Sequence, residues 1–234
     1  RWHDQAWSHL EHAVRTGESA FVHAFGMSTF DWLSEHPDEA RIHSMAMAAN
    51  LRPRTEAIVQ AIDFSRFNVV VDVGCGNGAL LNAIVDRNPD IIGIGTDLEH
   101  AIIEANRLFA TNGIADRCQA EPCDFLVSVP SGGDLYILSN ILHDWDDEHC
   151  CKILHYCRKA MENDSKLAIV EFLIPPDNEF SPAKLLDLEM MVMSGGGRER
   201  RESEFRTLLH SAGFTIESIT PLDTGEMIAM ATRA

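Results

Sequence analysis

The sequence predicts an α/β fold in which a seven-stranded, mostly parallel sheet is covered by helices and preceded by a purely helical segment. Three observations support this prediction. Apolar residues in positions 1–64 recur at the three-to-four spacing of helices. From residue 65 onward, short apolar runs alternate with helical patterns, the order typical of a parallel sheet covered on both faces. A glycine-rich stretch follows the first of these runs directly, at a position where such folds bind ligands.

The helical segment, positions 1–64, carries two apolar stripes, formed by Trp7, Leu10 and Val14 and then by Phe21, Phe25, Phe30 and Leu33. We expect one helix to open at Pro37, because the first turn of a helix tolerates proline. A separate helix is predicted over 55–62. Short helices without a strand cannot easily form a core of their own, so we expect this segment to pack on the rest as a linker and a pocket wall.

Residues 65–234 are predicted to form a single ligand-binding domain. Strands are expected over 68–73, 91–96, 118–121, 135–138 and 166–174, and a closing antiparallel hairpin pair over 214–220 and 226–232. The helices between them are predicted over 79–86, 98–111, 147–161, 182–193 and 203–212. The helix over 147–161 has acidic residues in its first turn and Arg158 and Lys159 in its last, which complements the helix dipole.

Composition and charge exclude several classes of protein. The 234 residues are 45% hydrophobic and 24% charged, as in ordinary folded proteins. The net charge of -17 disfavours binding to nucleic acids or to anionic membranes. No apolar run approaches the roughly 18 residues that span a bilayer. The six cysteines match no disulfide framework or standard zinc pattern, which indicates reduced thiols and a cytoplasmic location.

The glycine-rich stretch reads VDVGCGNGA over residues 71–79 and places Gly74, Gly76 and Gly78 between a strand and a helix. A turn of this kind needs positive φ angles and lets a ligand approach the backbone closely. The loop fits a dinucleotide as well as other nucleotide cofactors, and it also fits a tight turn without any ligand.

Three carboxylates distinguish between these cofactors. Asp72 ends a buried strand, Asp97 ends the second strand and Asp124 follows the third, so all three are expected at the same edge of the sheet. A pyrophosphate would meet like charges there, whereas a ligand with an ammonium and a sulfonium group would be favoured. Asp97 lies about twenty residues beyond the loop, where an acid can accept both ribose hydroxyls. Together the acids favour S-adenosylmethionine.

His143 follows the fourth strand in the stretch LYILSNILHDWDDEHC and is therefore expected at the same edge. Histidine is a suitable base for taking a proton from a phenol or enol, since it titrates close to neutral pH. Glu171 and Glu199 are candidates to orient its ring. The alternative role of His143 is simply that of a residue at the start of a helix. No metal site is predicted, because an acidic first helical turn explains Asp144, Asp146 and Asp147.

Five ordered motifs carry a resemblance to a known family. They are VDVGCGNG, GTDLEH, CDF, ILHDWDDEHCCKIL and GGGRERRESEFRTLLHSAGF. From about Trp7 to its end the chain resembles the small-molecule O-methyltransferases of the caffeic acid and hydroxyindole (acetylserotonin) type. This is a metal-independent class I family with a Rossmann-like fold. The resemblance implies methyl transfer from S-adenosylmethionine to a hydroxyl of a small aromatic or polyketide-like acceptor, which would be the molecule bound against the helical segment.

The resemblance also implies roles for individual residues. His143 would be the proton acceptor, bracketed by Glu171 and Glu199. Cofactor contacts are expected from Asp72, Gly74, Gly76, Asp97, Leu98, Asp124, Phe125 and Ser139. The acceptor pocket is expected to include Met47, Asn140, Met190 and Ser194, although the methionines would suit a plain core equally well.

The chain departs from the family pattern in three places. Many plant members have a lysine where this chain has Ser139, and many relatives read GGG where this chain reads GCG, which puts Cys75 beside the ligand. Members usually begin with a winged-helix dimerisation domain that is absent here, and the chain begins with Arg1 rather than methionine. We therefore expect it to be part of a longer protein whose full-length form is a homodimer.

Three alternative functions remain open at this point. A relative on the same scaffold could act as a decarboxylase or hydroxylase that keeps the cofactor without methyl transfer, although the presence of His143, Glu171 and Glu199 disfavours it. A nicotinamide-dependent oxidoreductase is disfavoured by Asp72 and Asp124. A non-catalytic subunit would bind the cofactor and turn over nothing.

Overall fold

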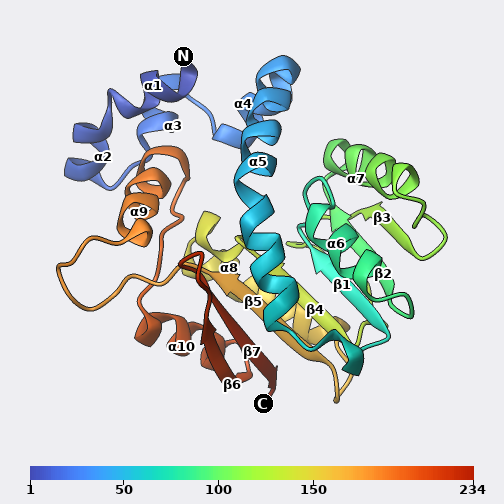
Figure 1. Ribbon diagram of the computed structural model, residues 1–234. Coiled ribbons are helices and arrows are strands. Elements are labelled where there is room, and N and C mark those ends of the chain that lie inside the picture. The colour runs from blue at the N-terminus through green and yellow to red at the C-terminus, as the bar shows by residue number, and fades with distance from the viewer.

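A seven-stranded sheet forms the centre of the computed structural model, which describes residues 1–43, 45–46, 53–99 and 101–234. Its order is β3-β2-β1-β4-β5-β7-β6 (Figure 1). The strands are β1 (Val69–Val73), β2 (Ile92–Asp97), β3 (Cys118–Pro122), β4 (Leu135–Ser139), β5 (Lys166–Glu171), β6 (Phe214–Pro221) and β7 (Met227–Arg233). The first five are parallel, and β7 runs antiparallel between β5 and β6. The predicted sheet and its antiparallel closing pair are confirmed.

Helices cover both faces of the sheet. One face packs against α6 (Ala79–Arg87), α7 (Glu99–Thr111) and the end of α5 (Pro37–Ala61), and the other packs against α8 (Asp147–Ala160) and α10 (Glu202–Ser211). Successive residues of a strand point to opposite faces, so Leu135 and Ile137 join the first core while Tyr136 and Leu138 join the second. Burial on both faces explains why these strands read as continuous apolar runs.

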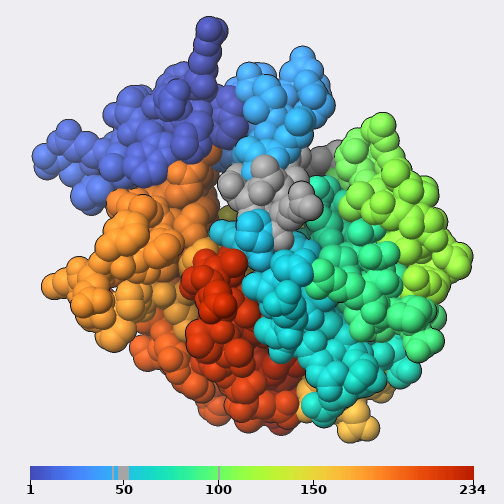
Figure 2. All heavy atoms as spheres, in the orientation of Figure 1, coloured from blue at the N-terminus to red at the C-terminus, as the bar shows by residue number. Residues whose placement is uncertain are grey.

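The first four helices form a layer that packs on α9. They are α1 (Trp2–Trp7), α2 (Leu10–Thr16), α3 (Ala20–Phe25) and α4 (Thr29–Glu35). Their small and aromatic side chains, among them Ala6 and Phe21, pack with Val192 and Met193 of α9 (Pro182–Met193). Figure 2 shows the dark blue start of the chain resting on the orange region that contains α9, away from the green half of the molecule. Val14 and Phe30, expected in the apolar stripes, are instead exposed.

Helix α5 corrects one prediction about the helical segment. The separate helix expected over 55–62 is wrong, because α5 continues without interruption from Pro37 to Ala61 with Pro53 inside it. A proline removes one backbone hydrogen bond, but tertiary packing can hold the helix on both sides of it. Here Ile58 and Val59 are buried in the core of the sheet domain, and the helix also packs against α4.

The fifth strand ends earlier than predicted. We expected it to run to residue 174, but β5 ends at Glu171, where its pairing with Met227 of β7 stops. Beyond that point Leu173 bridges to Arg200, and the Ile174 N–H donates to the Arg200 carbonyl at 2.9 Å. The chain therefore leaves the sheet to pair with the segment around Arg200.

Within the described residues, none of the helices has the length and apolarity required of a membrane span.

Candidate active site

The carboxyl ends of the parallel strands bring the predicted site residues to one edge of the sheet. Asp72 and Val73 end β1, Asp97 ends β2, Ser139 ends β4 and Glu171 ends β5. In open parallel sheets, this edge is the place where ligands bind. The order β2-β1-β4-β5 places the glycine loop after β1 next to the segment that follows β4 and carries His143.

The glycine loop is held by the neighbouring strand. The N–H groups of Gly74 and Cys75 donate to the Thr96 carbonyl at 2.8 and 2.9 Å, and the Gly76 N–H donates to Asp97 Oδ2 at 2.8 Å. Gly76 has a φ of 55° and open space where a side chain would begin. A residue here thus needs the left-handed backbone, and the side of the loop that a ligand approaches is free.

Asp72 and Asp97 form a pair of interacting acids beneath this loop. The side chain of Asp72 is buried, and burial together with the negative charge of Asp97 raises the pKa of Asp72 to about 7. Burial disfavours the ionised form of a carboxyl group, and a cation that binds nearby stabilises this form. The electrostatics at this edge therefore favour a positively charged ligand over a diphosphate.

Three other predicted cofactor residues follow β2 and β3. Leu98 is exposed beside Asp97, and its N–H donates to Asp97 Oδ1 at 2.7 Å. Asp124 is exposed, and its Oδ1 accepts from the Leu126 N–H at 2.9 Å, so its carboxylate caps its own turn. Phe125 packs edge-on against Trp145, with ring centroids 6.0 Å apart, and also lies next to Gly74. The structure thus brings Phe125 to the loop.

Ser139 and Asn140 follow β4 directly. Asn140 is the single non-glycine residue with positive φ among those described, at 54°. Its N–H donates to the Val170 carbonyl at 2.9 Å, while its side-chain Oδ1 is buried without a hydrogen-bond partner in the described part of the chain. Strained backbone and unsatisfied polar atoms of this kind concentrate at functional sites. The sequence analysis places Asn140 in the pocket without using these two observations, because a sequence does not show backbone angles.

His143 lies on a short 3₁₀ turn, η2 (Leu142–Asp144), between β4 and α8. Its Nδ1 is 2.8 Å from Glu199 Oε1 and 3.8 Å from Glu171 Oε2, and its Nε2 is 3.8 Å from Asp144 Oδ1. Glu171 also fixes the turn itself, since its Oε1 accepts from the N–H groups of Ile141 and Leu142 at 3.1 and 2.8 Å. One glutamate therefore orients the ring and the other holds the backbone that carries it.

The carboxylates around His143 change its protonation. Burial by itself lowers the pKa of the imidazole, but the negative charges of Glu171, Asp144 and Glu199 outweigh this and raise the pKa of His143 to about 10. Burial also raises the pKa of Glu171 to about 7 against the opposing effect of His143. The surrounding carboxylates thus favour the imidazolium form of the ring, which the hydrogen bond to Glu199 holds in place.

His143, Glu171 and Glu199 also bring three potential metal-ligand atoms within 4.8 Å of one another, the single such group in the described part of the chain. The Oε2 atoms of both glutamates are buried and have no hydrogen-bond partner among the described residues. His143 Nδ1 and Glu199 Oε1 of this group are joined directly by a hydrogen bond. Asp146, in turn, caps α8 by accepting from the His149 N–H at 2.9 Å, as the acidic first turn predicts.

Two of the predicted acceptor residues, Met190 and Ser194, lie on or beside α9. Met190 is buried on this helix, and Ser194 follows its end and donates to the Met190 carbonyl at 2.9 Å. Gly197 packs so closely against the His143 carbonyl and Ser194 Oγ that no side chain fits there. This contact places Ser194 beside the turn of His143. Met47 lies outside the described residues.

Two residues of the site were not predicted from the sequence. The Glu199 N–H donates to Asp187 Oδ1 of α9 at 3.0 Å, which fixes the backbone of the glutamate. Arg200 is 4% exposed, and it contacts the backbone on both sides of His143. The sequence reads RERR over 198–201, and only the fold shows which arginine is buried. The one available signal was that an arginine adjoins a predicted catalytic glutamate.

Comparisons with known proteins identify the family of the chain. A family model described as an O-methyltransferase domain matches residues 7–215. The phenazine O-methyltransferase PhzM of Lysobacter antibioticus is 42% identical over 227 residues, which cover 97% of this chain and 66% of that protein. The crystal structure of LaPhzM has a TM-score of 0.96 and 41% identity, and the match covers 100% of this chain and 70% of that one.

A further solved structure contains ligands. NcsB1, an O-methyltransferase from neocarzinostatin biosynthesis, was solved in complex with S-adenosylmethionine and 2-hydroxy-5-methyl naphthoic acid. It is 28% identical with a TM-score of 0.91, and the match covers 99% of this chain and 69% of that one. The chain thus spans about two thirds of the length of these relatives.

The sheet order, the glycine loop and the histidine with its glutamates define a Rossmann-like protein of the methyltransferase class. Within that class, the chain belongs to the O-methyltransferase domain family, whose model matches most of its length.

Proposed function

We propose that this protein binds S-adenosylmethionine and transfers its methyl group to a hydroxyl of a small aromatic or polyketide-like molecule. The observation that carries the proposal is the hydrogen bond between His143 Nδ1 and the buried Glu199, at the same sheet edge as the loop that Asp97 holds through Gly76. A loop for the donor and an oriented imidazole for the acceptor are the two parts that such a transfer needs.

The cofactor would lie across the glycine loop. Asp97, which already bonds the loop at Gly76, is suited to accept the ribose hydroxyls. The buried acid Asp72 supplies negative charge for the ammonium and sulfonium groups. Phe125 and the exposed Leu98 offer apolar surface for the adenine, beside Asp124, and Ser139 lies at the end of β4 on the opposite side of the loop.

The reaction would be an in-line displacement. The acceptor oxygen attacks the methyl carbon, the new C–O bond forms as the S–C bond breaks, and S-adenosylhomocysteine leaves with the electron pair on sulfur. His143 takes the hydroxyl proton on Nε2, because Nδ1 is already bonded to Glu199.

Because the pKa of His143 is raised, the proposed mechanism also depends on the positive charge of the cofactor. An imidazolium with a pKa of about 10 must lose a proton before it can act as a base. A sulfonium near the site lowers that pKa, because it disfavours a second cation. An imidazole whose pKa approaches that of a phenol also transfers the proton with little change in free energy.

The acceptor would bind between the sheet edge and the helical segment 1–64, against Met190, Ser194 and Asn140, with Met47 as a further candidate. The apolar packing of α9 against α1 to α4 makes this layer a rigid wall for a flat molecule. The full-length protein is proposed to be a homodimer.

The test is to incubate the protein with S-adenosylmethionine and a panel of hydroxylated aromatic acids, naphthoic acids and phenazines, and to measure product masses and S-adenosylhomocysteine. A product heavier by one methyl group supports the proposal. Loss of carbon dioxide or gain of oxygen instead would indicate a decarboxylase or a hydroxylase. Cofactor binding without any product across the panel would indicate a non-catalytic subunit, and displacement of S-adenosylmethionine by a nicotinamide cofactor would indicate an oxidoreductase.

A further inference from the structure

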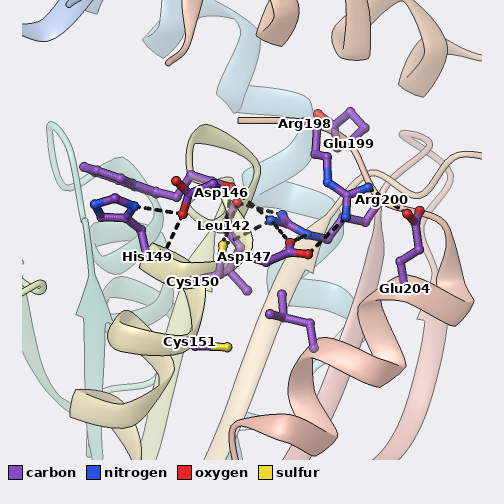
Figure 3. Close-up of polar contacts among 12 residues, drawn as sticks. Leu142, Asp146, Asp147, His149, Cys150, Cys151, Arg198, Glu199, Arg200 and Glu204 are labelled. Atoms are coloured by element: carbon purple, nitrogen blue, oxygen red, sulfur yellow. Dashed lines mark hydrogen bonds and ion pairs between the residues drawn. The ribbon is translucent and has the colours of Figure 1, made fainter. Parts of the chain in front are cut away.

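Arg200 makes a dense set of contacts around the turn that carries His143. Its Nη1 donates to the Leu142 carbonyl at 2.9 Å and its Nη2 donates to the Trp145 carbonyl at 2.9 Å. These two carbonyls lie on either side of His143 and Asp144 in the chain. Figure 3 shows the guanidinium of Arg200 reaching toward Leu142 and the start of α8. A single buried side chain therefore bridges both ends of the turn.

The guanidinium is itself fixed at its other edge. Asp147, the first residue of α8, accepts from Arg200 Nε at 2.9 Å and from Nη2 at 2.7 Å through Oδ1. Arg200 Nη2 also lies 3.3 Å from the sulfur of Cys150. The rigid, planar fork of an arginine holds a carboxylate and backbone carbonyls in one fixed geometry, whereas the rotatable ammonium of a lysine does not impose such a geometry. The position of the turn is thus tied to the start of α8.

The residue before Arg200 is the glutamate that bonds the His143 ring. The segment is extended here, as its bridge to Leu173 shows, so neighbouring side chains point in opposite directions. Glu199 reaches the imidazole, and Arg200 reaches the backbone on both sides of it. The ring and its peptide backbone are consequently held by one short stretch of chain.

Gly197 adds a third contact from the same stretch. A side chain at this position would collide with the His143 carbonyl and with the backbone of Asp144. The segment therefore packs directly on the turn, and a loosened contact there would let the turn move.

We propose that Arg200 is a positioning residue, which fixes the turn of His143 between Glu199 and the acceptor through its bonds to the Leu142 and Trp145 carbonyls and to Asp147. Arg200 does not touch the reacting atoms. The inference rests on the proposed function for its catalytic consequence, but not for the geometry of the ring.

The test compares Arg200→Gln and Arg200→Lys with a matched control, Arg198→Gln. Arg198 pairs with the same Asp147, at 3.2 Å, and with Glu204, but no hydrogen bond joins it to the turn. We expect kcat to fall about 10- to 100-fold in Arg200→Gln, because displacement of a catalytic group by about 1 Å has effects of this size. Arg200→Lys should retain more activity than Arg200→Gln, and KM for S-adenosylmethionine should stay within about twofold in both. Arg198→Gln should match the wild type in kcat.

A second readout follows the His143 ring without turnover, by NMR titration of its ring resonances. The groups facing the ring are Glu171 from β5, Glu199 from the segment before α10, and Asp144 from its own turn. In Arg200→Lys, which keeps the positive charge, the contact with Glu199 loosens, so the pKa of His143 should move toward the ordinary value. In Arg198→Gln it should stay in place.

These readouts separate the two proposals. If His143→Ala abolishes turnover while both Arg200 variants keep wild-type kcat and His143 titration, the positioning role is wrong even if the melting temperature falls. If the titration shifts but His143→Ala remains fully active, the base assignment is wrong and the positioning role stands. Should Arg200→Gln fail to fold, Asp147→Asn loosens the same guanidinium from an exposed position. It should lower kcat by a smaller factor and shift the titration in the same direction, and an unchanged titration there would overturn the inference.

Discussion

Glu199 Oε1 lies 2.8 Å from His143 Nδ1, although 56 residues separate the two in the chain. The glutamate is almost fully buried and its backbone N–H is bonded to Asp187, so it cannot follow the ring if the ring moves. The hydrogen bond fixes which nitrogen of His143 remains for a substrate. This relationship is the basis of the predictions below on turnover and pH.

We expect His143→Ala to lower turnover by about 10²- to 10⁴-fold, the range typical for loss of a general base. Affinity for S-adenosylmethionine should be nearly unchanged, because the hydrogen bonds and ion pairs of His143 within the described residues go to Glu199, Glu171 and Asp144 and not to the glycine loop. Steady-state kinetics and calorimetry measure the two effects. His149→Gln is a suitable control, since His149 binds the half-buried Asp146 at the start of the next helix. Wild-type turnover in His143→Ala would remove the base assignment.

The pH dependence of kcat/KM should reflect the negative charges of the carboxylates around His143. Because the base is active only when deprotonated, kcat/KM for the acceptor is expected to rise with pH through the pKa of His143. In the free protein that pKa is about 10, and the sulfonium lowers it, so at saturating cofactor the midpoint should lie between about 6.5 and 10. In Glu199→Gln one negative charge is lost, and the midpoint should move to lower pH. A rate that decreases throughout this range would contradict the prediction.

Asp97→Ala should affect the cofactor before it affects chemistry. The substitution removes the acceptor for the Gly76 N–H and the proposed ribose contact together, so we expect the dissociation constant for S-adenosylmethionine to rise by at least about tenfold, as for a lost charged hydrogen bond. Turnover at saturating cofactor should change less. Asp86→Asn on the exposed side of α6 provides the control in calorimetry. Retained affinity in Asp97→Ala would eliminate the ribose role.

Asp72→Asn is expected to stabilise the protein while weakening cofactor binding. The folded pKa of about 7 exceeds the unfolded value of 3.8, so the unfolded state releases its proton first and stability falls as pH rises from about 4 to about 7. An asparagine does not ionise, so its substitution removes this loss of stability at high pH. At pH 8 the free energy of unfolding should therefore increase by about 2 to 4 kcal/mol, with little difference at pH 4. Denaturant melts at both pH values measure this, and equal gains at both would show that charge is not the cause.

Much of the fold followed from local patterns. The apolar runs that became β1, β4 and the start of β5 are buried on both faces, as expected of parallel strands between two helical layers. The glycines of the loop predicted positive φ angles, which Gly74, Gly76 and Gly78 all adopt. The wrong predictions of secondary structure concern elements in which tertiary packing overrides the local sequence pattern. Helix α5 runs through Pro53 because the sheet core and α4 hold its two ends.

The sequence by itself determined which residues could carry chemistry, since strand ends in a parallel sheet meet at one edge and so bring Asp72, Asp97 and His143 together. Only the tertiary structure decided how they act on one another. The raised pKa of His143, the hydrogen bond to Glu199 and the burial of Arg200 rather than Arg198 all depend on distances between segments far apart in the chain. Charges interact through space and not along the sequence, which is why pattern alone could not supply these relationships.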